Sequence, residues 1–115
     1  MAGSDSSFVT AIEMSRLFRA GELSPVDVLD ALLDRIEAIN PAINAYVDVF
    51  HESARADARA AENALRDGTA GPLAGIPVSI KDLVATVEGR TTYGSRAFRD
   101  FRPGFDAITG GSALT

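Results

Sequence analysis

The sequence predicts an α/β fold with helices in the first part of the chain and a strand early in the second. Apolar residues recur at helical spacing up to about Ala70. From Gly71 onward, prolines and glycines interrupt that pattern before the short run Val78-Ser79-Ile80, which has strand character. We expect residues 1–115 to be the N-terminal part of one domain, with 1–70 mainly helical and 71–115 the start of an α/β core.

Composition narrows the classes of function. The 115 residues carry 11 basic and 16 acidic side chains, giving a formal charge of -5, and the acidic residues are spread along the chain. An acidic surface of this kind repels phosphate, so the sequence predicts no nucleic-acid partner. Hydrophobic residues make up 46% of the chain, which is enough for one modest core.

The chain has no cysteine, and its one histidine is His51. This excludes a disulfide framework and a thiolate nucleophile, and a lone histidine cannot form a metal site, so we predict neither metal nor cofactor. The first residues lack the basic start and apolar run of a secretory signal, and no stretch approaches the ~18 apolar residues of a membrane span. The sequence therefore predicts a cytoplasmic protein with no membrane partner.

Two helix starts are marked by capping residues. Thr10 followed by Glu13 fits a capping box, and Gly21 provides a left-handed stop for the first helix. Ser24 can accept a hydrogen bond from a free amide, and Pro25 suits the first helical position, so a second helix is predicted to begin there.

The second helix is amphipathic. Its apolar residues recur at intervals of three and four, namely Leu29, Leu32, Leu33, Ile36 and Ile39. We expect Asn40-Pro41 to end it. The alternation of residues 45–50 then predicts a short extended segment.

A third helix is predicted from His51 to Asp67, followed by Gly68 as its terminator. Its inner face is shallow because it consists mostly of alanine: Ala54, Ala58, Ala61 and Leu65. A face of this kind suits close packing against another element.

Lys81 is the residue with the clearest potential for chemistry. It follows the predicted strand, so its side chain could project inward from a strand end. A lysine ordinarily titrates near pH ~10.4, and one that acts as a base near neutrality must be neutral, which burial promotes. A neutral amine could accept a proton from a hydroxyl nucleophile. A solvated strand end, or an ion pair with Asp82, is the alternative.

Two segments resemble the amidase signature family. Gly71-Pro72-Leu73-Ala74-Gly75-Ile76-Pro77-Val78-Ser79-Ile80-Lys81-Asp82 resembles that family's Gly-Pro-Leu-x-Gly-Ile-Pro-x-x-x-Lys-Asp segment. Thr91-Thr92-Tyr93-Gly94-Ser95 resembles the Thr-Thr-x-x-Ser segment that follows it there. Upstream, Gly21-Glu22-Leu23-Ser24-Pro25 and Asn40-Pro41 look like the family's N-terminal helices. The resemblance spans about Thr10 to Asp106.

The resemblance implies hydrolysis of a carboxamide by a Ser–cis-Ser–Lys triad, in which the position matching Lys81 is the base and acts through a bridging serine. It also implies a mixed-sheet core, so the chain would be the truncated start of that core. In the family, both serines lie in a Gly/Ser-rich stretch well downstream of the lysine. We therefore expect this chain to carry only the lysine of the triad, and its substrate to be a small-molecule amide.

Other residues are weaker candidates. Gly110-Gly111-Ser112 looks like a glycine-rich catalytic turn, but such a turn needs flanking structure to hold it. Ser79 and Ser95 have no matching family role and are interpreted as ordinary strand or loop residues. For Asp82, two roles stay open: orienting Lys81, or capping the following turn.

Two other functions remain open. The amidase-like subunit of a tRNA-dependent amidotransferase shares the lysine segment and works with partner subunits, although the stretch from Tyr93 to Phe98 looks more like stand-alone amidases. Alternatively, the chain could be a non-enzymatic helical fragment used in binding or assembly. The sequence identifies neither the amide substrate nor the oligomeric state, and a homo-oligomer is compatible with it.

The first prediction concerns the 115-residue chain by itself. We expect no amidase activity from it, because a base without nucleophile and oxyanion donors cannot form an acyl-enzyme. The measurement is ammonia release by the purified chain, with a full-length amidase as the positive control. Turnover that a serine-directed inhibitor abolishes would contradict the prediction and would assign the nucleophile to Ser79, Ser95 or Ser112.

Overall fold

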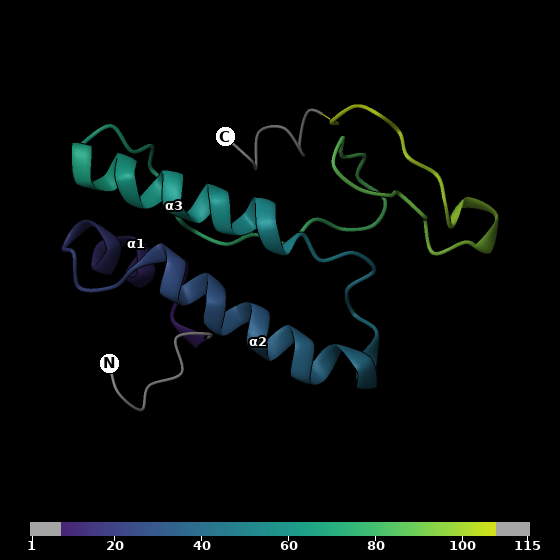
Figure 1. Cartoon of the computed structure of the whole chain (residues 1–115), viewed down its shortest axis with the longest axis horizontal. Coiled ribbons are helices and arrows are strands. Elements are labelled where there is room, and N and C mark those ends of the chain that lie inside the picture. Colours follow the sequence, from purple (N-terminus) through teal and green to yellow (C-terminus); the bar gives the residue numbers. More distant parts are fainter. Residues whose placement is uncertain (1–7, 108–115) are drawn as a thin grey trace. The chain divides into compact units, whose positions relative to one another are not determined.

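The computed structural model describes residues 8–107, and these form helices and loops (Figure 1). The helices are α1 (Ala11–Arg19), α2 (Pro25–Ile43), α3 (His51–Asp67) and the short 3-10 helix η2 (Arg96–Phe98). The chain divides into two compact units, unit 1 (Met1–Pro77) and unit 2 (Val78–Thr115). Unit 1 contains all three of these α-helices.

Helix α1 begins and ends as the sequence predicts. The Thr10 hydroxyl accepts a hydrogen bond from the Glu13 amide at 3.2 Å, as an N-cap does. After the helix, Gly21 has φ +71° and Glu22 donates its amide to the Leu17 carbonyl at 3.0 Å. This bond closes the helix end, and glycine takes the left-handed conformation there without a steric penalty.

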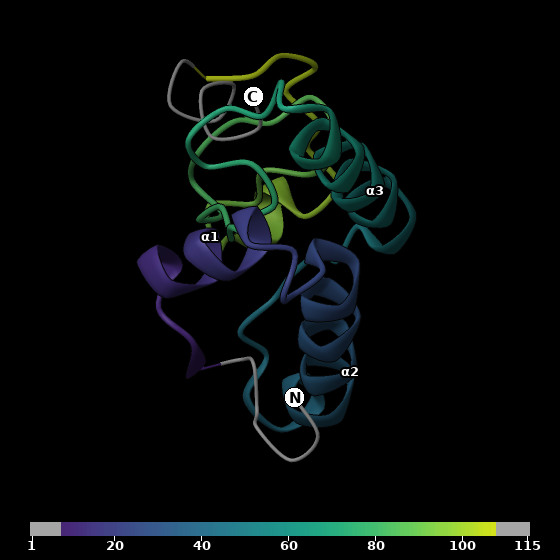
Figure 2. The same cartoon turned by 90° about the vertical axis from the view of Figure 1, so that its left-hand side faces the viewer.

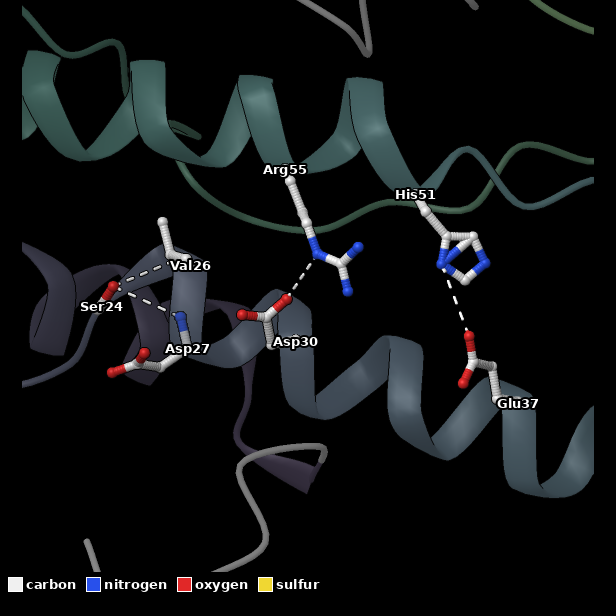
Figure 3. A network of polar contacts seen from close by, with 7 residues as sticks. All are labelled: Ser24, Val26, Asp27, Asp30, Glu37, His51 and Arg55. Carbon is white, nitrogen blue, oxygen red and sulfur yellow. Dashed lines mark hydrogen bonds and ion pairs between the residues drawn. The ribbon is translucent and has the colours of Figure 1, made fainter.

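The predicted start of α2 is also confirmed, whereas its predicted end is wrong. The Ser24 hydroxyl accepts hydrogen bonds from the amides of Val26 at 3.1 Å and Asp27 at 3.4 Å (Figure 3). Pro41 does not end the helix, which continues to Ile43. A proline in the last turn removes one helical amide but leaves the following turn intact.

The loop after α2 is not a strand. Asn44 has φ +49° and ends the helix. The side-chain amide of Asn40 then donates to the Tyr46 carbonyl at 3.1 Å and accepts from the Tyr46 amide at 2.9 Å. Both backbone groups of Tyr46 are thus occupied by a side chain, which accounts for the absence of strand pairing at residues 45–50.

Helix α3 matches its prediction from His51 to Asp67. Gly68 ends it with φ +75°, and its amide bonds the Ala64 carbonyl. Ala58 on the predicted shallow face is buried. The small side chain at this position allows the helix backbone to approach its neighbours closely.

Helices α2 and α3 lie side by side, as the two views in Figures 1 and 2 show, and α1 also contacts α3. The centre of the core consists of Met14 and Phe18 from α1 and Val28 from α2. Partly buried residues pack around it: Val9, Leu23, Leu32, Leu65 and Ile76. Val28 is only 1% exposed, so the first turns of α2 are the most deeply enclosed part of this core.

Polar contacts also join α2 to α3 (Figure 3). Arg55 on α3 donates to the Asp30 carboxylate on α2 at 2.9 Å. Nearer the loop between α2 and α3, the His51 Nδ1 atom lies 3.8 Å from the Glu37 Oε1 atom. These side chains are partly exposed, so solvent screens the pairs and they orient the helices more than they stabilise them.

The segment after α3 returns to α1 and the start of α2. Arg19 donates to the Gly71 carbonyl at 2.8 Å, and Ile76 packs against the core. Between them Gly75 has φ +81°, and a Cβ placed on it would lie 2.8 Å from Pro25 Cγ and 3.2 Å from Phe18 Cδ2. The glycine is required here both by its backbone conformation and by the space available.

The predicted α/β fold class, with the first strand of a mixed sheet, is wrong for the described residues. Residues 8–107 contain helices and no strand. Val78 and Ser79 are exposed, and no backbone hydrogen bond joins residues 78–80 to another described segment. A strand exists only when a neighbour pairs with its backbone, and the described chain offers Val78-Ser79-Ile80 none.

Across residues 8–107, no helix combines the length and the apolar character needed to cross a membrane.

The close packing at Gly75 gives a prediction for stability. Gly75→Ala should lower the free energy of unfolding by about 3 kcal/mol, since the new methyl group meets Pro25 and the left-handed backbone disfavours a side chain. Urea unfolding followed by circular dichroism measures this change.

Gly71→Ala is the matched control, because a Cβ at Gly71 meets nothing within 4 Å. Its unfolding midpoint should stay close to that of the original chain. Equal midpoints for the two variants would show that the Gly75 contact does not constrain the fold.

Candidate functional site

Lys81 lies in unit 2, immediately before a tight turn. Its carbonyl accepts hydrogen bonds from the amides of Leu83 at 2.7 Å and Val84 at 2.9 Å. The side chain is exposed, and its ammonium has no hydrogen-bond or ion-pair partner among residues 8–107. The turn therefore fixes the lysine backbone and leaves the amine available.

Asp82 connects the lysine turn to the second family segment. Its carboxylate accepts hydrogen bonds from the Thr92 amide, at 2.7 Å, and from the Thr92 hydroxyl. The Asp82 carbonyl accepts the Tyr93 amide at 3.1 Å. Three hydrogen bonds thus join Asp82 to Thr92 and Tyr93, about ten residues further along the chain. Two of the three have the carboxylate as acceptor, and hydrogen bonds to a carboxylate are stronger than those to a neutral oxygen.

The second segment forms a tight turn at Thr92 to Ser95. Tyr93 and Gly94 have φ of +54° and +68°, and the Ser95 amide donates to the Thr92 carbonyl at 2.9 Å. Positive φ at both central residues is the mark of a type I′ turn. The Thr92 hydroxyl also accepts a hydrogen bond from the Gly94 amide at 3.3 Å, so the Thr92 side chain stabilises the turn that its own residue begins.

The two turns border a hollow of about 400 Å³. It is lined by Lys81, Asp82, Leu83, Tyr93 and Gly94. The hollow thus brings the residue of the lysine turn that carries an amine close to residues of the second turn.

Aromatic rings pack against Tyr93 of the second turn. The Tyr93 ring meets Phe98 edge-on, with centroids 5.4 Å apart, and stacks on Phe101 at 6.5 Å. Nearby, the fully buried Thr91 donates its amide to the Phe101 carbonyl at 3.0 Å. The turn is therefore backed by the chain that follows it.

The Asp82 carboxylate makes a contact that neither of the two roles left open for it includes. No ion pair forms between the side chains of Lys81 and Asp82 among the described residues. The carboxylate instead bonds the amide and the hydroxyl of Thr92. The expected inward projection of Lys81 from a strand end is wrong for the described residues, because residues 8–107 contain no strand and the Lys81 side chain is exposed to solvent.

The serine candidates do not join Lys81. The Ser95 hydroxyl accepts the Ala97 amide at 3.2 Å and so caps η2. Neither Ser79 nor Ser95 lines the hollow. The Gly110-Gly111-Ser112 turn lies outside the described residues.

Sequence reasoning missed two features of the site. Lys81 is the only lysine in the chain, which a residue count reveals at once. The positive φ of Tyr93 has only a weak signal in the sequence, namely the glycine that follows it, because tyrosine is an unusual residue for that conformation.

No group of three metal-binding side chains occurs within residues 8–107.

Comparison with known proteins gives the family. The model of the family described as Amidase matches residues 27–109, which include Lys81 and both turns. This chain belongs to the amidase family. The resemblance that the lysine and Thr-Thr segments suggested is thereby confirmed.

Two curated relatives are named as subunits of glutamyl-tRNA(Gln) amidotransferase. The chain is 45% identical over 98 residues to the one from Halorhodospira halophila, a match covering 85% of this chain and 20% of that protein. It is 39% identical over 99 residues to the protein of the same name from Desulfosudis oleivorans, a match covering 86% of this chain and 20% of that protein. The chain thus spans about a fifth of the length of these relatives. No solved structure matches it.

The clamp between Asp82 and Thr92 gives a third prediction. Thr92→Val keeps the side-chain shape but removes the hydroxyl, leaving one oxygen of a part-buried carboxylate without its donor. We expect the free energy of unfolding to fall by about 1–3 kcal/mol. Urea unfolding measures this loss, and hydrogen exchange at the Tyr93 amide reports whether unit 2 loosens.

Thr91→Val is the matched control. The Thr91 hydroxyl is buried and has no hydrogen-bond partner among the described residues, so its removal should cost nothing or should stabilise the chain. If Thr91→Val destabilises as much as Thr92→Val, the loss comes from packing and the clamp has no special role.

Proposed function

We propose that this chain supplies the general base of an amidase that cleaves the carbon–nitrogen bond of a carboxamide, and that Lys81 is that base. The observation that carries the proposal is that Lys81, whose amine has no partner among the described residues, lines the hollow bordered by the two turns. Family membership supports the chemistry, because the lysine occupies the position that resembles the family's catalytic one.

The chemistry proposed is acyl transfer through a Ser–cis-Ser–Lys triad. The neutral lysine amine takes a proton from the bridging serine, which takes one from the nucleophilic serine. The serine oxygen then bonds to the amide carbon, the carbon–nitrogen bond breaks, and the nitrogen leaves with a proton returned along the same path. Water hydrolyses the acyl-enzyme.

The surroundings of Lys81 set a condition on this proposal. Its side chain is exposed in the described residues, whereas a lysine base is a buried amine in a site from which water is excluded. The base therefore requires further chain of the amidase to cover the hollow and exclude water. The relatives are longer than this chain, since the match covers 20% of the length of the Halorhodospira halophila protein.

A second candidate function is a role within an amidotransferase complex. Both relatives carry the name of glutamyl-tRNA(Gln) amidotransferase. In such a protein, the same hydrolysis would release ammonia from a donor amide for transfer to a second substrate, and partner subunits would take part. Ammonia release from glutamine that depends on added partner subunits and charged tRNA would favour this function over a stand-alone amidase.

The fourth prediction tests the base. In the longer protein that carries these residues, Lys81→Ala should lower kcat for a simple amide by several orders of magnitude, because proton transfer from the serines is lost. Lys81→Arg should be little better, since a guanidinium stays protonated. Steady-state ammonia release measures both.

Arg96→Ala serves as the control, because Arg96 is an exposed cation of the same unit that does not line the hollow. Its kcat should stay near that of the original protein. Near-normal turnover by Lys81→Ala would remove Lys81 from the mechanism.

A further inference from the structure

The hydrogen bonds on either side of Lys81 fix its backbone. Its ammonium has no hydrogen-bond or ion-pair partner among the described residues, so hydrogen bonds within this part of the chain reach the lysine only through its main chain. The Lys81 carbonyl accepts hydrogen bonds from the amides of Leu83 at 2.7 Å and Val84 at 2.9 Å. These two bonds set the direction in which the chain leaves the lysine.

Asp82, the next residue, is held to a segment ten residues away. Its carboxylate accepts hydrogen bonds from the Thr92 amide, at 2.7 Å, and from the Thr92 hydroxyl, and its carbonyl accepts one from the Tyr93 amide at 3.1 Å. Thr92 is only 7% exposed, so water competes little for its hydroxyl. The residue that follows Lys81 is thus fixed through both its backbone and its side chain.

Proton transfer requires a base whose position is defined. The nitrogen must lie within hydrogen-bond reach of the proton that it takes, and a displacement of about 1 Å can cost about a hundredfold in rate. The reach of a lysine amine begins at its backbone, so a shift of the Lys81 turn moves every position that the amine can occupy. The side chains of Lys81 and Asp82 form no ion pair among the described residues, so Asp82 can influence the amine through the backbone.

We propose that Thr92 is a positioning residue for the base: by holding Asp82, it keeps the Lys81 backbone where the amine reaches the bridging serine. The inference rests on the proposed function, since it takes Lys81 to be the base. The effect of Thr92 passes through Lys81, which takes part in proton transfer and not in substrate binding. Loss of the Thr92 hydroxyl should therefore lower kcat and leave KM nearly unchanged.

The test uses the longer protein that carries these residues. Thr92→Val removes the hydroxyl but keeps the backbone amide, and it should lower kcat for a simple amide by about tenfold or more, with KM changed less than about twofold. Asp82→Ala removes both carboxylate acceptors and should lower kcat at least as far. Thr92→Ser keeps a hydroxyl and should retain most of kcat. A normal kcat in Thr92→Val beside an inactive Lys81→Ala would overturn the inference and leave the proposed function intact.

A double variant separates positioning from a general loss of folded protein. If Thr92 acts through Lys81, adding Thr92→Val to Lys81→Ala should not slow the residual turnover further. A further loss by the same factor as in the single variant would mean that Thr92 acts on folding or on another group, and would overturn the inference. Near-normal turnover by Lys81→Ala would overturn the proposed function and the inference with it.

Hydrogen exchange gives a second readout that requires no activity. The amides of Leu83 and Val84 donate to the Lys81 carbonyl, so their exchange rates report whether the lysine turn is ordered. Both should exchange faster by about tenfold or more in Thr92→Val. Thr91→Val is the control and should leave them unchanged, because it removes a buried hydroxyl that has no partner among the described residues. Unchanged exchange in Thr92→Val would overturn the inference even if kcat fell.

Discussion

The bond between the Asp82 carboxylate and Thr92 is the constraint on which the described part of unit 2 depends. Residues 78–107 contain one short 3-10 helix and no strand, so no ladder of backbone bonds holds their segments together. Single bonds take that role: the Asp82 carboxylate accepts from both the amide and the hydroxyl of Thr92, and isolated backbone bonds join Thr91 to Phe101 and Ala107 to Ala85. The residue beside the proposed base thus has a structural role, since its carboxylate bonds Thr92.

The helices could be predicted from the sequence because their signals are local. Thr10, Ser24 and Gly68 each act within a few residues of their own positions, and each cap is found where the local pattern predicts it. The prediction at Pro41 was wrong because a proline weakens a helix without forbidding one more turn. The strand at Val78-Ser79-Ile80 failed for a different reason, since strand pairing depends on partners that a local pattern does not contain.

The candidate site also contains features with local sequence signals and features that depend on distant residues. Lys81 could be proposed from the sequence because the motif around it is contiguous and the family match includes it, and its role as the base stays a prediction. The partner of Asp82 is ten residues away and could not be chosen from the two local roles that the sequence allowed. The left-handed backbone of Tyr93 depends on the Asp82 carbonyl and on two phenylalanine rings, and no pattern of residue types specifies those contacts.

The contact between Gly75 and Pro25 restricts which substitutions related sequences can carry at these two positions. Pro25 begins α2, and Gly75 precedes Lys81 by only a few residues, yet the glycine backbone lies against the proline ring. Neither position can accept a bulkier residue independently. Across related sequences, the two should therefore behave as a coupled pair, in which a side chain at the glycine is tolerated only when the ring opposite it has been exchanged for something smaller.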